Sequence, residues 1–207
     1  MINLGKTSTG YNGQSSHVID VPVVPQGKWG ETVNWRLLEG KIPNDELVTA
    51  VFGLLIVESG VVLVTTTRGY LELLGGHREA GETIEQTLDR ESYEEGGVKV
   101  IERIPFGYRE VSNECEIVNK ATGKPYPSIG FIPLFVGTGE ADLSAPLPED
   151  VVARTIVPFD QLKNLNAEMM PDFAILQIGL RHAVRLDSLN ATQKKAISDH
   201  LVVGPTF

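Results

Sequence analysis

The chain has 207 residues, of which 42% are hydrophobic and 22% charged, so it can bury the core of one domain and differs from a disordered protein. Its net charge of −9 disfavours a nucleic-acid-binding surface or an anionic membrane surface. The chain has no run of ~18 apolar residues, no signal-peptide pattern and a single cysteine, Cys115, so we expect a cytoplasmic protein without internal disulfides.

The first 45 residues differ in composition from the rest of the chain. Residues 1–16 are rich in Gly, Ser, Thr and Asn, which predicts a flexible lead. Strands are expected at His17–Val24 and Thr32–Leu38, because both stretches are rich in β-formers and bounded by turn residues. We interpret residues 1–45 as a flexible lead and a β arm or small extra sheet. The arm can pack on its own domain, residues 46–207, or on a second subunit of a homodimer.

A β-hairpin and a glycine loop open the main domain. Glu46–Val57 is a long apolar run, a Glu-Ser-Gly turn follows it, and Val61–Thr66 is β-branched, which is the pattern of two paired strands. Because the first strand is apolar on both faces, we expect it in the centre of a sheet. Tyr70–Leu73 is a short strand that leads into the glycine loop Gly75-Gly76.

An amphipathic helix follows the glycine loop. Thr83 and Gln86 have the spacing of a capping box, and Gly96-Gly97 supplies a stop. Its buried face is marked at four-residue spacing by Ile84, Leu88 and Ser92. We expect the Ser92 hydroxyl to bond back to the carbonyl of Leu88.

The remainder of the chain alternates between strands, one long loop and helices. A Gly/Pro/acidic loop is expected at Gly137–Asp150, long enough to be functional. The predicted strands are 98–104, 106–118, 128–137 and Val151–Val157, and the predicted helices are Asp160–Leu165, Asp172–Leu186 and Ala191–Val203. A mixed sheet with helices on its flanks, an α/β fold, follows from this order.

Three carboxylates crowd the last turn of the amphipathic helix: Glu91, Glu94 and Glu95. Like charges at three- and four-residue spacing repel by roughly 0.2–0.5 kcal/mol per pair. The C-terminal end of a helix also favours cations, by about 0.3–1 kcal/mol. A divalent cation would remove this conflict, and oxygen ligands suit Mg²⁺ or Mn²⁺. The alternative is an acidic solvated helix face.

The stretch from Gly76 to Val98 resembles the Nudix box, whose pattern is G-x5-E-x7-R-E-U-x-E-E-x-G-U, where U is a bulky aliphatic residue. The fixed positions are matched by Gly76, Glu82, Arg90, Glu91, Glu94, Glu95, Gly97 and Val98. Ser92 departs from the pattern, since an aliphatic residue or Ala is usual there. The resemblance implies an α/β/α sandwich with the box helix lying across the sheet.

The resemblance also implies a metal site. Glu91 and Glu95 would be direct ligands of Mg²⁺, or of Mn²⁺, and Glu94 a further ligand or a ligand through water. The backbone carbonyl of Gly75 would add another oxygen, and a close approach of the backbone explains a glycine there.

Arg90 and Glu82 are expected to support this site. A guanidinium has no lone pair to donate to a metal, so Arg90 would orient a carboxylate, either Glu94 or Glu82. The alternative is a simple surface ion pair. Glu82 precedes the helix, where negative charge suits the dipole, and the resemblance implies that it also braces the metal cluster.

Members of the family often carry another carboxylate on the loop before the last strand, as metal ligand or general base. Glu149 is our first candidate and Asp150 the second, and a solvated acidic loop is the alternative. Glu140 and Glu116 are further candidates. Glu72, just before the glycine loop, either reaches the site or is solvated.

The leading hypothesis is a Mg²⁺-dependent pyrophosphohydrolase that acts on a small nucleotide-type substrate. The diphosphate would belong to a nucleoside diphosphate linked to another group, as in ADP-ribose or a nucleotide sugar, or to a nucleoside triphosphate. Ser112–Glu116 holds neither the proline nor the tyrosine that mark two subfamilies. The alternatives are a non-catalytic nucleotide sensor and a prenyl diphosphate isomerase, which would need Cys115 as catalyst.

Aromatic and histidine residues outside the box have weaker assignments. The candidates for stacking on a base are Trp35, Tyr70, Tyr108, Tyr126 and Phe131, with core packing as the default for each. His77 is expected to be a loop histidine, and His182, on a helix with apolar neighbours, is expected to be structural.

Overall fold

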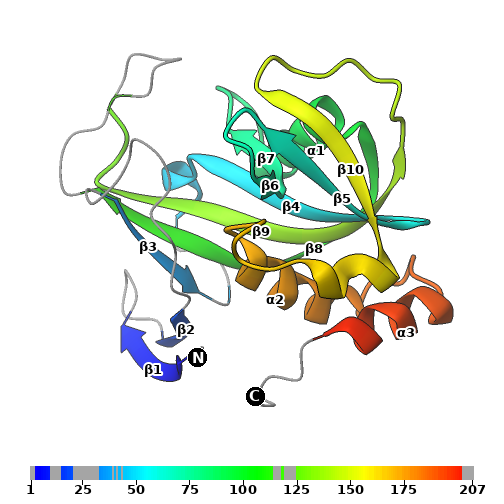
Figure 1. Ribbon diagram of the computed structural model, residues 1–207. Helices are drawn as coiled ribbons and strands as arrows, with labels where there is room; N and C mark the ends of the chain where they lie inside the picture. Colours follow the sequence, from blue (N-terminus) through cyan, green and yellow to red (C-terminus); the bar gives the residue numbers. More distant parts are fainter. Residues whose placement is uncertain are drawn as a thin grey trace.

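A computed structural model describes residues 3–9, 15–20, 33–38, 40, 42, 44–113, 118 and 125–201. One large mixed sheet is covered by helix α1 (Ile84–Gly96) on one face and by α2 (Phe173–Ala183) and α3 (Ala191–His200) on the other (Figure 1). This is the expected α/β arrangement of a sheet with helices on both flanks. Among the described residues, no helix is long and apolar enough to cross a membrane.

Within the described residues, the sheet has ten strands in the order β1-β2-β3-β8-β9-β4-β5-β10, with β6 beside β5 and β7 beside β4. Its strands are β1 (Asn3–Thr9), β2 (Ser15–Asp20), β3 (Val33–Leu38), β4 (Ala50–Val57), β5 (Gly60–Thr66), β6 (Leu71–Glu72), β7 (Leu74–His77), β8 (Val98–Asn113), β9 (Ile129–Ala141) and β10 (Val151–Pro158). β4 and β9 are parallel, and the other pairs are antiparallel. β4 is central and almost wholly buried, as its apolar sequence predicts.

The N-terminal strands extend this sheet and do not form a sheet of their own. β3 pairs with β8 from Val33 opposite Asn113 to Leu38 opposite Tyr108, so this part of the arm lies on its own domain. β1 occupies part of the stretch expected to be a flexible lead, because pairing with β2 supplies backbone hydrogen bonds that composition does not reveal. β2 covers part of the strand expected at His17–Val24, and residues 21–24 lie outside the described residues.

The central strands run further than the sequence predicts. β8 is one strand where two were expected, and a register shift between Pro105 and Gly107 lets it pass the proline. β9 continues to Ala141, four residues beyond the predicted end of the strand at Gly137, because its end pairs with the start of β8. The loop therefore consists of Asp142–Asp150.

Two short 3₁₀ helices and a short strand lie at or near the predicted ends of secondary-structure elements. η2 (Asp45–Leu47) is a 3₁₀ turn capped by Asn44, so the long apolar strand begins only at Ala50. The glycines expected in a loop belong to β7, which pairs with β4 through His77. η3 (Phe159–Asn164) lies where the first C-terminal helix was predicted.

The two faces of the sheet carry separate apolar clusters. Under α2 and α3 lies the larger core, built on alternate residues of β4 such as Leu54 and Ile56. Under α1 lies a smaller cluster that includes Val51 and Leu88. Because successive β4 side chains point to opposite faces, one strand serves both cores and fixes α1 against the sheet.

Candidate functional site

Helix α1 is positioned by local sequence signals at both ends. Thr83 Oγ1 accepts a hydrogen bond from the N–H of Gln86, and the Gln86 side chain accepts one from the N–H of Thr83, which completes the predicted capping box. The helix stops at Gly97, whose φ of 64° is left-handed and favours glycine. Its middle packs closely on β4, because a Cβ added to Gly53 would lie 2.6 Å from a methyl carbon of Leu88.

Ser92 lies on the buried face of α1, as predicted, but its expected hydrogen bond is absent. The side chain is fully buried, and its Oγ has no hydrogen-bond partner among the described residues. Thr87, by contrast, donates to the carbonyl of Thr83 at 3.1 Å. Ser92 shares the apolar stripe with Ile84 and Leu88, where no acceptor meets its hydroxyl, so the prediction of a bond to Leu88 was wrong.

Two glycines let β7 approach its neighbours without side chains in the way, Gly75 on the side of β4 and Gly76 on the side of α1. Gly75 has a φ of 150°, and a Cβ there would lie 2.1 Å from the carbonyl oxygen of Val51. A Cβ on Gly76 would lie 2.4 Å from Oε1 of Glu91. The Glu91 carboxylate thus rests directly on the backbone of β7, which only glycine permits.

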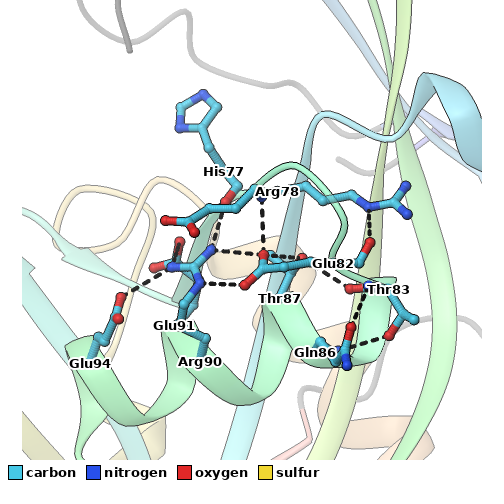
Figure 2. A network of polar contacts seen from close by, with 10 residues as sticks. His77, Arg78, Glu82, Thr83, Gln86, Thr87, Arg90, Glu91 and Glu94 are labelled. Atoms are coloured by element: carbon cyan, nitrogen blue, oxygen red, sulfur yellow. Dashed lines mark hydrogen bonds and ion pairs between the residues drawn. The ribbon is translucent and has the colours of Figure 1, made fainter. Parts of the chain in front are cut away.

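Arg90 is the centre of a polar network on this face of α1 (Figure 2). Its Nε donates to Glu82 Oε1 at 2.7 Å, and its Nη2 donates to Glu82 Oε2 at 3.1 Å. Nη1 is shared between Glu91 Oε1 at 2.9 Å and Glu94 Oε2 at 3.1 Å, and Nη2 also donates to the carbonyl of His77 at 2.9 Å. The structure therefore brings Arg90 into contact with both carboxylates that the sequence offered as alternatives.

Glu82 is a fully engaged carboxylate. Besides Arg90, it accepts hydrogen bonds from the N–H of Glu79 at 3.0 Å and from Thr87 Oγ1 at 2.9 Å. The hydrogen bond from Arg90, more than the other donors, lowers the pKa of Glu82 to about 2. Glu82 is thus ionised at neutral pH and ties the turn before α1 to the helix.

Glu91 and Glu95 have the opposite electrostatic character. Burial raises the pKa of Glu91, although Arg90 acts against the rise. Burial also raises the pKa of Glu95 to about 8, against a hydrogen bond from the N–H of Gly75 at 2.8 Å, and the charge of Glu91 adds to the rise. Arg90 partly compensates the charge of Glu91, whereas Glu95 has no ion pair within the described residues.

The donor chemistry of this cluster suits a hard divalent cation. Glu91, Glu94 and Glu95 offer only oxygen, and burial raises the pKa of the two partly buried carboxylates, Glu91 and Glu95. In the described part of the chain, no three His, Cys, Asp or Glu side chains already converge as a metal site. Instead, Arg90 holds Glu91 and Glu94, and the Gly75 N–H holds Glu95. The donors fit the cation, while their present contacts are with the protein.

Arg154 of β10 is a site residue that the sequence did not reveal. Its guanidinium donates to the backbone carbonyls of Glu95 at 2.5 Å and Glu94 at 2.6 Å, and to those of Ala145 and Pro146 in the loop Asp142–Asp150. It supplies the cation that the end of α1 lacks in its own sequence. No local signal marks it, because it lies 59 residues beyond Glu95.

The remaining carboxylate candidates differ in how close they lie to the α1 carboxylates. Glu72 accepts from Thr66 Oγ1 at 2.7 Å and pairs with Arg68, yet its charge and that of Asp150 both raise the pKa of Glu95. Asp150 therefore lies within electrostatic reach of the cluster. Glu149 and Glu140 are exposed, and Glu116 lies outside the described residues, as does Cys115.

Two of the proposed stacking aromatics belong to the core. Tyr108 and Phe131 are buried and pack edge to face with ring centroids 5.6 Å apart. Tyr126 lies beside the glycine strand, where its hydroxyl is 2.6 Å from Nε2 of His77, and burial lowers the pKa of that imidazole. Tyr70 is exposed, and of Trp35 the structure gives the backbone position in β3.

His182 has the structural role that was predicted. Its ring stacks on that of Phe106 across the α2 face of the sheet, with centroids 5.7 Å apart. It lies on the opposite face from α1 and its carboxylates.

Comparison with known proteins places this chain in a single family. The sequence profile of the NUDIX domain matches residues 46–174, more than half of the chain. No curated protein sequence matches the chain. Among solved structures, a mutant of the Bacillus subtilis pyrophosphohydrolase BsRppH is similar, with a TM-score of 0.54 and 15% identity over 75% of this chain and 93% of that one. This likeness supports the fold.

Two further structures are similar at lower TM-scores. A NUDIX hydrolase from Nitrosomonas europaea has a TM-score of 0.48 and 20% identity over 69% of this chain and 96% of that one. The NUDIX domain of Shewanella oneidensis NrtR, solved with ADP-ribose, has a TM-score of 0.46 and 15% identity over 65% of this chain and 87% of that one.

Proposed function

The chain belongs to the NUDIX family, whose members hydrolyse nucleoside diphosphate derivatives, and on this premise we propose that it is a Mg²⁺-dependent pyrophosphohydrolase. Its substrate would be a nucleoside diphosphate linked to another group, such as ADP-ribose or a nucleotide sugar, or a nucleoside triphosphate. The observation that carries the proposal is the placement of two partly buried carboxylates, Glu91 and Glu95, against the glycine backbone of β7.

The α1 carboxylates are the proposed cation ligands. Glu91, Glu94 and Glu95, with the carbonyl of Gly75, would hold Mg²⁺, or Mn²⁺ in its place. When bound, the cation shields the charge of the phosphates and makes a coordinated water more acidic. The close contact between Gly76 and the Glu91 carboxylate keeps that carboxylate at the edge of β7, where the backbone oxygen of Gly75 can join it.

Arg90 would keep these ligands oriented and ionised. It shares one nitrogen between Glu91 and Glu94 and binds Glu82 with the other two. Because Glu82 is itself anchored to the N–H of Glu79 and to Thr87, the guanidinium has a fixed position from which to hold the two ligands.

A carboxylate of the loop Asp142–Asp150 would take the proton from the attacking water. Glu149 and Asp150 are the candidates, and the charge of Asp150 acts on Glu95 across the site. A general base must lie within hydrogen-bond reach of the water it activates, and this loop adjoins the carboxylate end of α1.

Phosphate release from a panel of nucleotides tests the proposal. The panel contains ADP-ribose, nucleotide sugars, dinucleotides and nucleoside triphosphates, each with Mg²⁺ and with a chelator. We expect hydrolysis of at least one class with Mg²⁺ and none with the chelator. A protein that binds a nucleotide but hydrolyses none would contradict the proposal and favour a nucleotide sensor.

A further inference from the structure

We propose that Arg154 is a positioning residue, which sets the cation-binding end of α1 and the loop Asp142–Asp150 in a fixed relation to each other. The proposal deepens the proposed function and rests on it for its catalytic consequence. Its structural basis is independent of any substrate, because one guanidinium is bonded to four backbone carbonyls from two segments.

The first pair of carbonyls belongs to the last turn of α1. The final carbonyls of a helix have no partner within the helix, and those of Glu94 and Glu95 accept from Arg154 Nη2 and Nε at 2.6 and 2.5 Å. These are the backbone groups of two proposed ligands. Their position and direction therefore depend on a residue of β10.

The second pair of carbonyls belongs to the loop. Nη1 donates to Ala145 and Nη2 to Pro146, the latter at 2.8 Å. The start of the loop is also tied to the helix, because the N–H of Asp142 donates to the carbonyl of Gly97 at 2.6 Å. The proposed bases, Glu149 and Asp150, follow a few residues later on the same loop.

The geometry of the guanidinium explains why an arginine is needed. Its five N–H groups form a rigid planar fork, and four carbonyls on two sides can be satisfied at once. A lysine ammonium has three donors at one point and cannot span both segments. Removal of the fork would leave α1 and the loop joined chiefly through Asp142 and Gly97.

The test compares Arg154→Ala and Arg154→Lys with Arg103→Ala in the full chain. Arg103 also binds α1, through Asp89, but the structure gives it no contact with the loop, so it controls for the loss of an arginine beside the helix. Mn²⁺ binding is measured by the loss of the free-ion EPR signal, and backbone protection by hydrogen exchange, both without substrate.

We expect Arg154→Ala to weaken Mn²⁺ binding by about 10–100-fold, the usual cost of losing a residue that orients metal ligands. Arg154→Lys should also bind more weakly than wild type, and Arg103→Ala should match wild type. Exchange should accelerate at the amides of Asp142, Ser144 and Ala145 and stay unchanged in β4 and β5. Guanidinium ion, well below denaturing concentration, should restore part of the affinity of Arg154→Ala.

Unchanged Mn²⁺ affinity in folded Arg154→Ala, or equal losses in Arg154→Ala and Arg103→Ala, would overturn the proposal. If Arg154→Ala does not fold, wild-type affinity in Arg154→Lys would overturn it instead. A wild-type protein that binds Mn²⁺ in this manner but hydrolyses no nucleotide would refute the proposed function and leave the role of Arg154 intact.

Discussion

Glu82 and Glu95 lie at the two ends of one helix and are held in opposite ways. Three donors, led by Arg90, surround Glu82 and lower its pKa to about 2. Glu95 is partly buried with one backbone donor and with negative neighbours, and its pKa is raised to about 8. The first carboxylate has its positive charge built into the fold. The second still lacks one.

This difference separates a structural carboxylate from a candidate ligand within one motif. Residues with strongly shifted pKa values cluster at functional sites, but ion pairs in the scaffold shift them too. Here the direction of the shift distinguishes the two cases. The lowered pKa of Glu82 reflects donors that are already present, and the raised pKa of Glu95 reflects burial and negative neighbours with a single backbone donor.

Glu95→Gln removes the carboxylate that we propose as a cation ligand. We expect the rate of hydrolysis with Mg²⁺ to fall at least ~100-fold, because the change removes a proposed ligand. The free energy of unfolding without metal should stay equal or rise, since burial disfavours the charged form of Glu95 and glutamine carries no charge. Steady-state phosphate release and urea unfolding measure the two effects. Glu85→Gln, an exposed residue on the same helix, is the matched control.

Arg90→Lys should lower both the rate of hydrolysis and the stability of the protein. Lysine keeps the charge but cannot contact Glu82, Glu91, Glu94 and the carbonyl of His77 together. We expect the rate to fall by about 10–100-fold and the free energy of unfolding to fall by roughly 1.5–3 kcal/mol. Wild-type values in both assays would remove Arg90 from the account.

Glu82→Gln tests the structural role of Glu82 through the pH dependence of the free energy of unfolding. The unfolded carboxyl has a pKa near ~4.3 and the folded one about 2, so the unfolded state binds more protons between these values. The stability that Glu82 contributes should be complete above pH ~5 and be lost as the pH falls toward 2. Urea unfolding of wild type and variant across this range measures it. A difference that persists unchanged at low pH would contradict the assignment.

Ser92→Ala should have the smallest effect and leave both carboxylates in place. It removes a buried hydroxyl that has no partner, so we expect the free energy of unfolding to rise by about 1 kcal/mol. That corresponds to an increase in Tm of roughly 2–4 °C for a chain of this size. Hydrolysis should be unchanged. A loss of stability would show that the hydroxyl has an acceptor after all.

The sequence predicts the parts of the site that depend on local spacing. The capping box, the buried stripe and the glycine stop all lie within the helix or beside it, where periodicity and capping rules apply. The family resemblance predicts the three carboxylates and Arg90 as site residues. Strand β4 was also predictable, because a run that is apolar on both faces belongs in the centre of a sheet.

The sequence does not predict the parts that depend on distant partners. β1 forms in a polar segment because β2 lies beside it, and β8 passes Pro105 because a bulge and its pairing with β9 tolerate the proline. Arg154 follows the same rule, since its acceptors lie on α1 and on the loop. The sequence shows a cluster of negative charges at the C-terminal end of α1. The structure adds a positive charge there, because Arg154 of β10 binds the last carbonyls of the helix.

Mn²⁺ binding to wild type and to Glu95→Gln tests the central claim most directly, because it needs no knowledge of the substrate. Titration of the full chain, followed by the free-ion EPR signal, gives both affinities under one set of conditions. The account predicts saturable binding by wild type and an affinity at least ~10-fold weaker in Glu95→Gln. Equal affinities, with Glu85→Gln also unchanged, would contradict the assignment of the α1 carboxylates as the cation site.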